Sequence, residues 1–108
     1  MADSEAQSYT RLRRLLAEPA GSIIQGYDEA AWANCEALGY AELPIAHSLA
    51  VVAAVRAASA DLLERLSEAD LERYALHSAT GHYSVASWIT IYTKHPRDHA
   101  AQMAEAIH

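Results

Sequence analysis

The chain is poor in cysteine, proline and glycine, and it contains no phenylalanine. Its one cysteine, Cys35, excludes an internal disulfide and any zinc site made of several cysteines. No apolar run approaches the length of a membrane span, and the N-terminal stretch MADSEAQ has neither a basic nor an apolar region. We therefore expect a cytoplasmic protein without a membrane partner.

Basic residues are also scarce, since 8 lysines and arginines stand against 14 aspartates and glutamates, for a net charge of −6. Sequence-independent binding of nucleic acid depends on neutralising phosphates with lysine and arginine, so this balance argues against nucleic acid as a partner. The one basic cluster is Arg11, Arg13 and Arg14. Side chains at these spacings point in different directions from a helix, which favours a solvated surface.

The chain is rich in alanine and in helical periodicity. Apolar residues make up 52% of its 108 residues, whereas runs with the alternating or β-branched pattern of strands are short. We predict an all-α fold in a single domain, residues 1–108. Its core should consist of Leu, Ile and Val side chains together with Trp32, Trp88 and the tyrosines.

Start and stop signals divide the chain into helices. Pro19 and Gly21 should end the first one, while Asp28 suits the N-cap and Gly39 the C-terminal cap of a short second one. The predicted helices cover about Ser4 to Ala17, Asp28 to Leu38, a long stretch after Pro44 to about Leu66, one turn begun by Ser67, and about Ser84 to Ile107. The stretches GSIIQGY and YALHSATGHYS are predicted loops, the second turning at Gly81.

The long predicted helix carries an apolar stripe that an arginine interrupts. Its members recur at alternating spacings of four and three residues: Ile45, Leu49, Val52, Arg56, Ser59, Leu63 and Leu66. Arg56 therefore faces inward on this pattern. It could stabilise an anionic substrate, or it could be an ordinary helix arginine with its stem along apolar surface.

His95 and His99 lie four residues apart in the last predicted helix, on an inward-facing stripe with Val85, Trp88 and Tyr92. Imidazoles at this spacing can converge on one divalent cation, but a catalytic zinc-type site takes three protein ligands. On the residues alone, the pair could bind a metal or be satisfied by hydrogen bonds. Pro96 between them should kink the helix without separating them by more than one turn.

The remaining histidines and the cysteine give no clear third ligand. We expect surface or capping roles for His47, His77, His82 and His108. Cys35 should be packed, since no histidine or other base stands near it in the sequence.

The order of segments resembles the DinB/YfiT-like superfamily of four-helix-bundle proteins. Four segments show this resemblance: ADSEAQSYTRLRRLLAE, IIQGYDEAAWA with its Tyr-Asp-x-x-x-Trp pattern, the long predicted helix ending LLERLSEADLER, and the C-terminal segment HSATGHYSVASWITIYTKHPRDHAAQM. The resemblance implies an up-down-down-up helical bundle with a divalent metal, Zn, Ni, Fe or Mn, on three histidines. It implies that His95 and His99 are two of these ligands.

The family's third ligand falls immediately before Met1, and its first helix before that. The resemblance thus implies an N-terminally shortened domain of about three main helices and a connecting helix. Asp3 or Glu5 could then supply the third ligand, or a histidine from a partner chain or an upstream tag could complete the site. A bundle that lacks one helix exposes apolar side chains, so we expect a homodimer or higher oligomer.

Two functions follow as hypotheses. In the first, the chain is a metal-dependent enzyme or its remnant, a thiol-dependent S-transferase or a hydrolase acting on a small thiol or another small molecule, with Arg56 as a candidate catalytic residue. In the second, it is a non-catalytic helical dimerisation module without metal. Stoichiometric binding of metal by the untagged protein distinguishes the two.

Overall fold

The computed structural model describes residues 2–92, and every structural statement below concerns that part of the chain. Its elements, in order, are α1 (Ala2–Ala17), β1 (Ile23–Ile24), α2 (Glu29–Ala33), a 3-10 helix (Glu36–Leu38), α3 (Ile45–Arg65), α4 (Glu68–Leu71), β2 (Tyr74–His77) and β3 (Gly81–Ser84). Residues 85–92 are helical and follow β3 directly. The fold is mainly helical, as the sequence predicts, with one small sheet.

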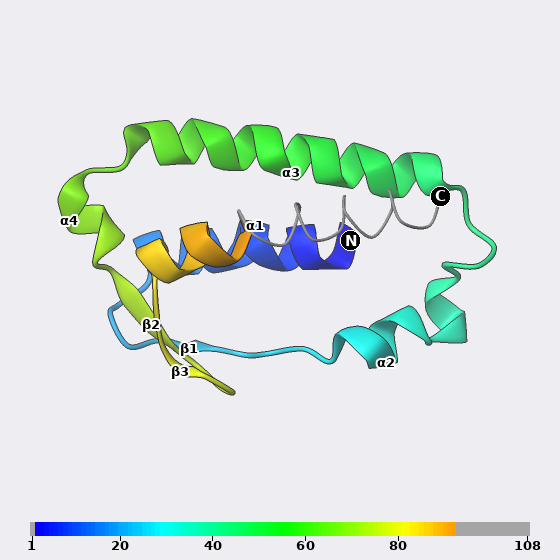
Figure 1. The fold of residues 1–108 in the computed structure, drawn as a ribbon, viewed down its shortest axis with the longest axis horizontal. Coiled ribbons are helices and arrows are strands. Elements are labelled where there is room, and N and C mark those ends of the chain that lie inside the picture. The colour runs from blue at the N-terminus through cyan, green and yellow to red at the C-terminus, as the bar shows by residue number, and fades with distance from the viewer. Residues whose placement is uncertain (1, 93–108) are drawn as a thin grey trace, which may run out of the picture.

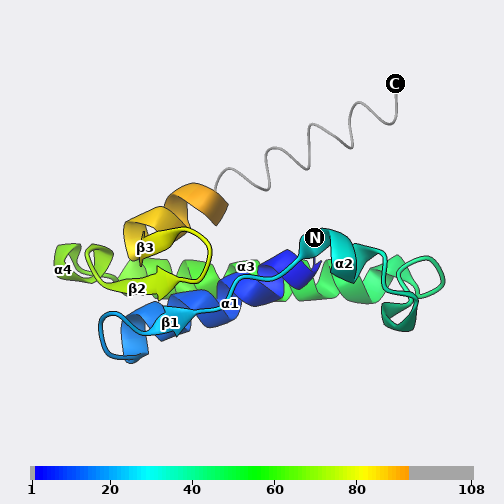
Figure 2. The same cartoon turned by 90° about the horizontal axis from the view of Figure 1, so that it is seen from below.

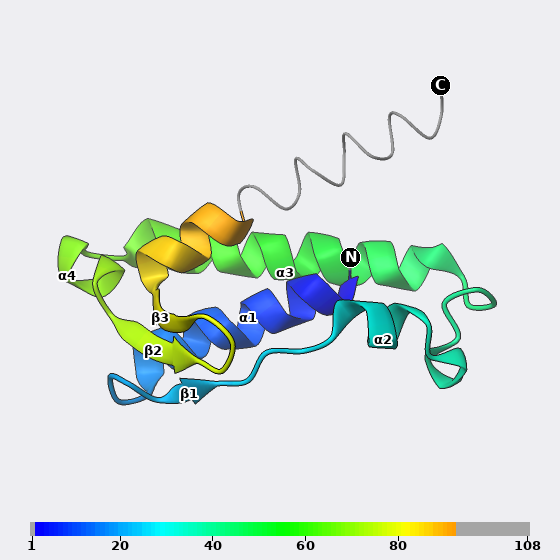
Figure 3. The same ribbon diagram turned by 60° about the horizontal axis from the view of Figure 1, so that its bottom comes forward.

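The two long helices, α1 and α3, lie side by side and run in the same direction, while the helix at 85–92 runs back against them (Figures 1 and 3). The sheet and α4 lie at one end of this pair, and α2 lies at the other in every view (Figures 1 and 2). The chain between α1 and α3 therefore travels the length of the molecule, which is what allows consecutive long helices to be parallel.

The helix boundaries follow the predicted caps. The Asp28 carboxylate accepts a hydrogen bond from the Ala31 amide at 3.0 Å, and Gly39 adopts the left-handed conformation with φ of 71°. Ser67 and Asp70 form a capping box at the start of α4. Ser84 caps the helix that follows it, since its hydroxyl accepts from the Ser87 amide at 3.0 Å. The caps at Asp28 and Ser67 and the start of the last helix at Ser84 are confirmed. The predicted helix from Asp28 to Leu38 is interrupted after Ala33, so Gly39 caps the 3-10 helix Glu36–Leu38 instead of α2.

The sheet lies in the two stretches predicted to be loops. Strand β2 pairs parallel with β1 and antiparallel with β3, and His77 lies opposite Gly81 across a three-residue turn. Gly81 has a φ of 80°, so it does serve as the turn residue. The sequence pattern does not predict β2, because Ala75 is its buried residue, while the larger Tyr74 and Leu76 are exposed. That pattern reverses the usual alternation of large apolar and polar residues.

The core gathers where the sheet end of α1 meets the sheet and the helix at 85–92. Its fully or nearly buried apolar members are Leu12, Leu15, Ile24, Ala75, Tyr83, Val85 and Trp88. Arg73 links the segment before β2 to α1, because its Nε donates to the Leu15 carbonyl at 3.0 Å. Leu15 lies near the C-terminus of α1, where carbonyls lack helical partners. Trp32, which we expected in the core, is 37% exposed and instead packs edge-on against Tyr27.

The apolar stripe of α3 packs along only part of its length. Ser59 is buried and Leu63 is half-buried, but Ile45 is 72% exposed and Leu49 is 56% exposed. The pairing of Arg56 with Glu5 sets the register, so the first residue of α1 lies beside position 53 of α3. Residues 45–52 consequently extend about 12 Å beyond α1 at 1.5 Å per residue. We refer to this exposed part of α3 as the overhang.

Helix α3 is also long and apolar enough to cross a membrane by length and composition. The expectation that no run approaches a membrane span is therefore wrong for this segment. Seven of its 21 residues are alanine, and it carries Arg56, which pairs with a carboxylate of α1. Length and composition alone do not assign a helix to a bilayer, since a helix of a water-soluble protein passes the same criterion.

Candidate functional site

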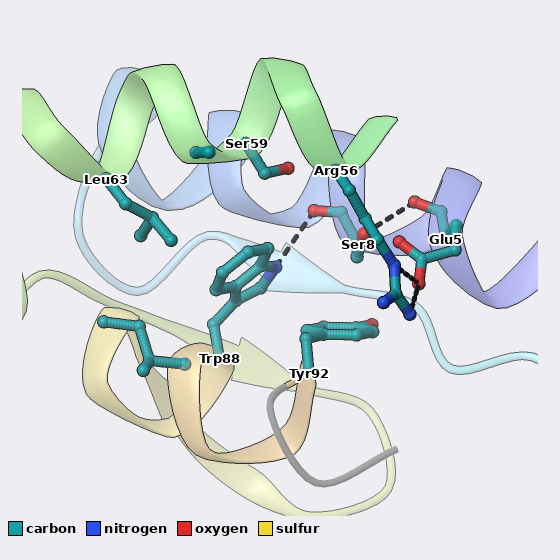
Figure 4. A pocket seen from close by; sticks show the side chains of 9 residues that line it. Glu5, Ser8, Arg56, Ser59, Leu63, Trp88 and Tyr92 are labelled. Atoms are coloured by element: carbon teal, nitrogen blue, oxygen red, sulfur yellow. Dashed lines mark hydrogen bonds and ion pairs between the residues drawn. The ribbon is translucent and has the colours of Figure 1, made fainter. Parts of the chain in front are cut away.

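A cavity of about 170 Å³ lies between α1, α3 and the helix at 85–92 (Figure 4). Nine residues from these three helices surround it: Glu5, Ser8, Arg56, Ser59, Ala60, Leu63, Trp88, Ile89 and Tyr92. We call it the interhelical pocket. Its wall is mostly apolar, with a few polar groups of fixed position, which is the usual composition of a small-molecule site.

An ion pair forms one side of the interhelical pocket. Arg56 donates from Nε at 3.0 Å and from Nη2 at 2.7 Å to the same oxygen of Glu5. The Glu5 side chain is only 11% exposed, whereas that of Arg56 is 42% exposed. The inward placement of Arg56 thus has a structural reason, since it neutralises a buried carboxylate. A substrate anion would have to share this guanidinium with Glu5.

Trp88 forms the floor of the pocket and is 4% exposed. Its indole N–H donates to the Ser8 carbonyl at 3.0 Å, and the Ser8 hydroxyl donates to the Glu5 carbonyl at 2.6 Å. These bonds fix the ring against α1, as Figure 4 shows. The sequence correctly placed Trp88 on the inward stripe of the last helix, although it gave no hint of its hydrogen bond.

Ser59 contributes a hydroxyl group to the interhelical pocket. It is 6% exposed, and its hydroxyl makes no hydrogen bond to any described residue. Figure 4 shows this hydroxyl directed from α3 toward the space above Trp88 and Ser8. A buried hydroxyl without a partner costs about 1–3 kcal/mol, so this atom is a natural contact for a polar group of a bound molecule. The helical period predicts Ser59 on the apolar stripe, but nothing in the sequence predicts a role for its hydroxyl.

The metal candidates are only partly within the described residues. His95 and His99 lie outside them. Of the two candidate third ligands, Glu5 accepts from Arg56, and Asp3 accepts from the Tyr40 hydroxyl. The bond to Asp3 raises the pKa of Tyr40 to about 12, because it holds the phenolic proton. Within residues 2–92 no group of three or more His, Cys, Asp or Glu side chains is placed to hold a metal ion. That part of the chain therefore does not by itself provide a metal site.

The other histidines that the structure describes are consistent with the expected surface and capping roles. His77 caps the turn between β2 and β3, where its Nδ1 accepts from the Ala79 amide at 3.0 Å. His82 is exposed and stacks on Tyr74, and His47 is exposed in the first turn of α3. His108 lies outside the described residues. Cys35 is exposed, so the prediction that it is packed is wrong. The residues around Cys35, between positions 28 and 44, are nearly all exposed as well.

The basic cluster divides as helical spacing requires. Arg14 is exposed, and Arg13 lies over the ring of Tyr9 with 3.4 Å between the guanidinium carbon and the ring centre. Arg11, in contrast, is only 9% exposed. The prediction of a solvated cluster therefore fits Arg13 and Arg14 but is wrong for Arg11, which points toward the sheet and the last helix.

Comparison with known proteins agrees with this architecture. A protein of Oceanobacillus iheyensis named "Putative metal-dependent hydrolase" is 36% identical over 103 residues, which are 95% of this chain and 58% of that protein. A protein of the same name from Bacillus mycoides is 32% identical over 101 residues, which are 94% of this chain and 56% of that protein. The chain thus spans somewhat more than half the length of these relatives.

A family model also matches, and it covers residues 2–103 of this chain. The matched range contains both long helices, the lining of the interhelical pocket, and the sequence positions of His95 and His99. The resemblance drawn from the order of the motifs is confirmed: the chain belongs to the DinB superfamily.

Proposed function

We propose that this chain is a metal-dependent hydrolase or S-transferase of the DinB type, with His95 and His99 as metal ligands and the interhelical pocket as its substrate site. The observation that carries the proposal is the position of Tyr92. Tyr92 lines the interhelical pocket, and His95 is three positions further along the sequence. The names of the two relatives support a hydrolytic reaction in preference to group transfer.

A divalent metal supplies a Lewis acid and lowers the pKa of a water or thiol bound to it. The described residues supply the remaining requirements of a site. Trp88 and Leu63 give apolar walls that exclude water from a small substrate, and Ser59 offers a hydroxyl to one of its polar groups. The half-exposed Arg56 contributes positive charge, moderated by Glu5, so a neutral or weakly polarised substrate suits the pocket better than a strongly charged one.

Reconstitution with metal tests the proposal. The untagged protein, stripped with a chelator, should gain thermal stability on addition of one of Zn, Ni, Fe or Mn, because a ligand that binds only the folded state stabilises it. His95→Ala and His99→Ala should lose this gain, while His47→Ala, on the exposed first turn of α3, should keep it. Hydrolysis of small activated ester or amide substrates should then require the same metal. Equal gains in all four proteins would contradict the proposal.

The overhang of α3 favours a second candidate, a homodimer that covers it. Between positions 45 and 55 the helix has no Asp, Glu, Lys or Arg, so two overhangs in antiparallel contact would bring no like charges together. Exposed Ile45 and Leu49 would be buried in such a contact, and neighbouring alanines would let the helices approach closely. A dimer of this kind is compatible with catalysis, and by itself it would constitute the interaction module without metal.

Sedimentation measures this second candidate directly. The wild-type chain should sediment as a dimer at micromolar concentration, and Leu49→Lys should shift it to a monomer. Ala54→Lys is the matched control, because position 54 is exposed on the opposite side of the same helix. A wild-type monomer at these concentrations would exclude the homodimer.

A further inference from the structure

Arg11 is a buried cation with no acidic partner among residues 2–92. It lies in the middle of α1 and is 9% exposed. Within residues 2–92 the only ion pair joins Arg56 to Glu5, so no described carboxylate neutralises Arg11. A buried charge is costly unless it is paired and hydrogen-bonded. Such an arginine therefore calls for an explanation.

The hydrogen bonds of Arg11 to described residues do not engage all of its N–H donors. Its Nη1 donates to the Tyr92 hydroxyl at 3.2 Å, and its Nη2 donates to the Gln25 carbonyl at 3.4 Å. Both distances are at the long end for such bonds. Its Nε is buried and makes no hydrogen bond of good geometry to any described residue, while the hydroxyl of Tyr83 interacts with both Arg11 and Tyr92. One N–H donor of this positively charged side chain, Nε, thus has no partner in the part of the chain that the structure describes.

The positive charge of Arg11 affects the pKa of His77 and of Tyr83. The pKa of His77 is lowered, first by burial and then by repulsion from Arg11. The pKa of Tyr83 is raised, chiefly by burial, and the positive charge of Arg11 opposes this rise. Arg11 therefore acts on both groups as a net positive charge.

A second cavity, also of about 170 Å³, lies beside Arg11 between α1 and β1. Its polar lining comes from Gln7, Thr10, Arg11, Arg14 and Gln25. The four α1 residues among these occupy positions i, i+3, i+4 and i+7, so they form one face of the helix. The volume is many times the roughly 15 Å³ that one water needs. The cavity thus has two arginines in its lining and room for a small group.

We propose that this second cavity binds a small oxyanion, the carboxylate or phosphate group of a small molecule, with Arg11 and Arg14 as its cationic contacts. Guanidinium groups suit such ligands because their planar N–H donors match the geometry of carboxylate and phosphate oxygens. The lining of this site differs from that of the interhelical pocket, whose arginine is neutralised by Glu5, although Arg11 donates to Tyr92 of that pocket. Binding of the anion would not require a metal.

Thermal unfolding of the full chain tests the proposal, with inorganic phosphate and acetate as probes and chloride at equal ionic strength as the reference. The wild type should gain stability with phosphate or acetate in a saturable way. Arg14→Met should need severalfold more anion, and Arg11→Met at least tenfold more. Arg13→Met is the matched control and should behave like the wild type, since Arg13 lies over Tyr9, away from the cavity.

The behaviour without added anion separates a binding arginine from a structural one. If Arg11 is there to bind a ligand, Arg11→Met in chloride alone should be as stable as the wild type or more so, because it removes an unpaired buried charge. Saturation by phosphate alone identifies a phosphate-bearing ligand, and saturation by acetate identifies a carboxylate. The proposal is overturned if neither anion stabilises the wild type, or if Arg14→Met and Arg13→Met respond to the anion identically.

Discussion

Arg56 on α3 and Glu5 on α1 are joined by two hydrogen bonds that end on a single carboxylate oxygen, at 3.0 Å from Nε and 2.7 Å from Nη2. This contact sets the register of the two parallel helices and closes one side of the interhelical pocket. It converts an arginine that the sequence places in an apolar stripe into the partner of a buried acid.

The first prediction concerns this pair. Arg56→Met should lower the free energy of unfolding by about 1–3 kcal/mol, because it leaves the largely buried Glu5 carboxylate unpaired. The double variant Glu5→Gln with Arg56→Met should recover part of the loss, since no buried charge remains. Urea unfolding of the two single variants and the double variant measures the coupling. Additive losses would show that the pair contributes nothing to stability.

The second prediction compares two serines that line the interhelical pocket. Ser59→Ala should leave stability unchanged or raise it by up to about 1 kcal/mol, because the buried hydroxyl has no partner among the described residues. Ser8→Ala should lower it by about 1 kcal/mol, because its hydroxyl bonds to the Glu5 carbonyl. If the pocket binds substrate, Ser59→Ala should nevertheless weaken turnover. A clear loss of stability in Ser59→Ala would argue for a structural role instead.

The third prediction compares the two tryptophans. Trp88→Ala should cost about 3–5 kcal/mol, since it opens a large cavity in the core and removes the bond to Ser8. Trp32→Ala should cost less than about 1.5 kcal/mol, because Trp32 is 37% exposed and its ring contact is with Tyr27. Denaturation followed by circular dichroism gives both values. Similar losses would mean that α2 is part of the cooperative core.

The fourth prediction concerns pH. The pKa of His77 in the folded chain lies below its ordinary value of 6.5. As pH falls through 6.5, the unfolded chain takes up the proton first, so protonation favours unfolding. The contribution of neutral His77 to the free energy of unfolding is therefore fully present above pH 6.5. It is lost as pH falls from 6.5 through the pKa of His77 in the folded chain. Protonation would also remove Nδ1 as the acceptor of the Ala79 amide.

His77→Gln should consequently show a smaller loss of stability between pH 7.5 and about pH 5 than the wild type. His82→Gln is the matched control, because His82 lies on the neighbouring strand and is exposed. The interpretation fails if both variants show the same pH dependence as the wild type.

Local signals in the sequence predicted much of the fold. Asp28, Gly39 and Ser67 act where cap chemistry places them, since each needs only neighbouring backbone atoms. Strand β2 was missed because its buried residue, Ala75, is the smallest of that strand. Ile45 was predicted to be inward because periodicity identifies a face, but it does not tell how far the neighbouring helix extends.

The site was predictable to a lesser extent. The inward stripe of the last helix correctly gave Trp88, because burial follows from the helical period. Neither the pairing of Arg56 with Glu5 nor the burial of Arg11 could be inferred, since both depend on contacts between segments far apart in the sequence. Charged clusters such as Arg11, Arg13 and Arg14 look solvated until the packing of their helix is known.

We propose that this DinB chain binds a divalent metal through His95 and His99. The most direct measurement is the metal content of the untagged protein after reconstitution and dialysis. We predict about one Zn, Ni, Fe or Mn per functional site in the wild type and in His47→Ala, with near-complete loss in His95→Ala and His99→Ala. Substoichiometric metal in the wild type, or equal metal in all four proteins, would contradict the account.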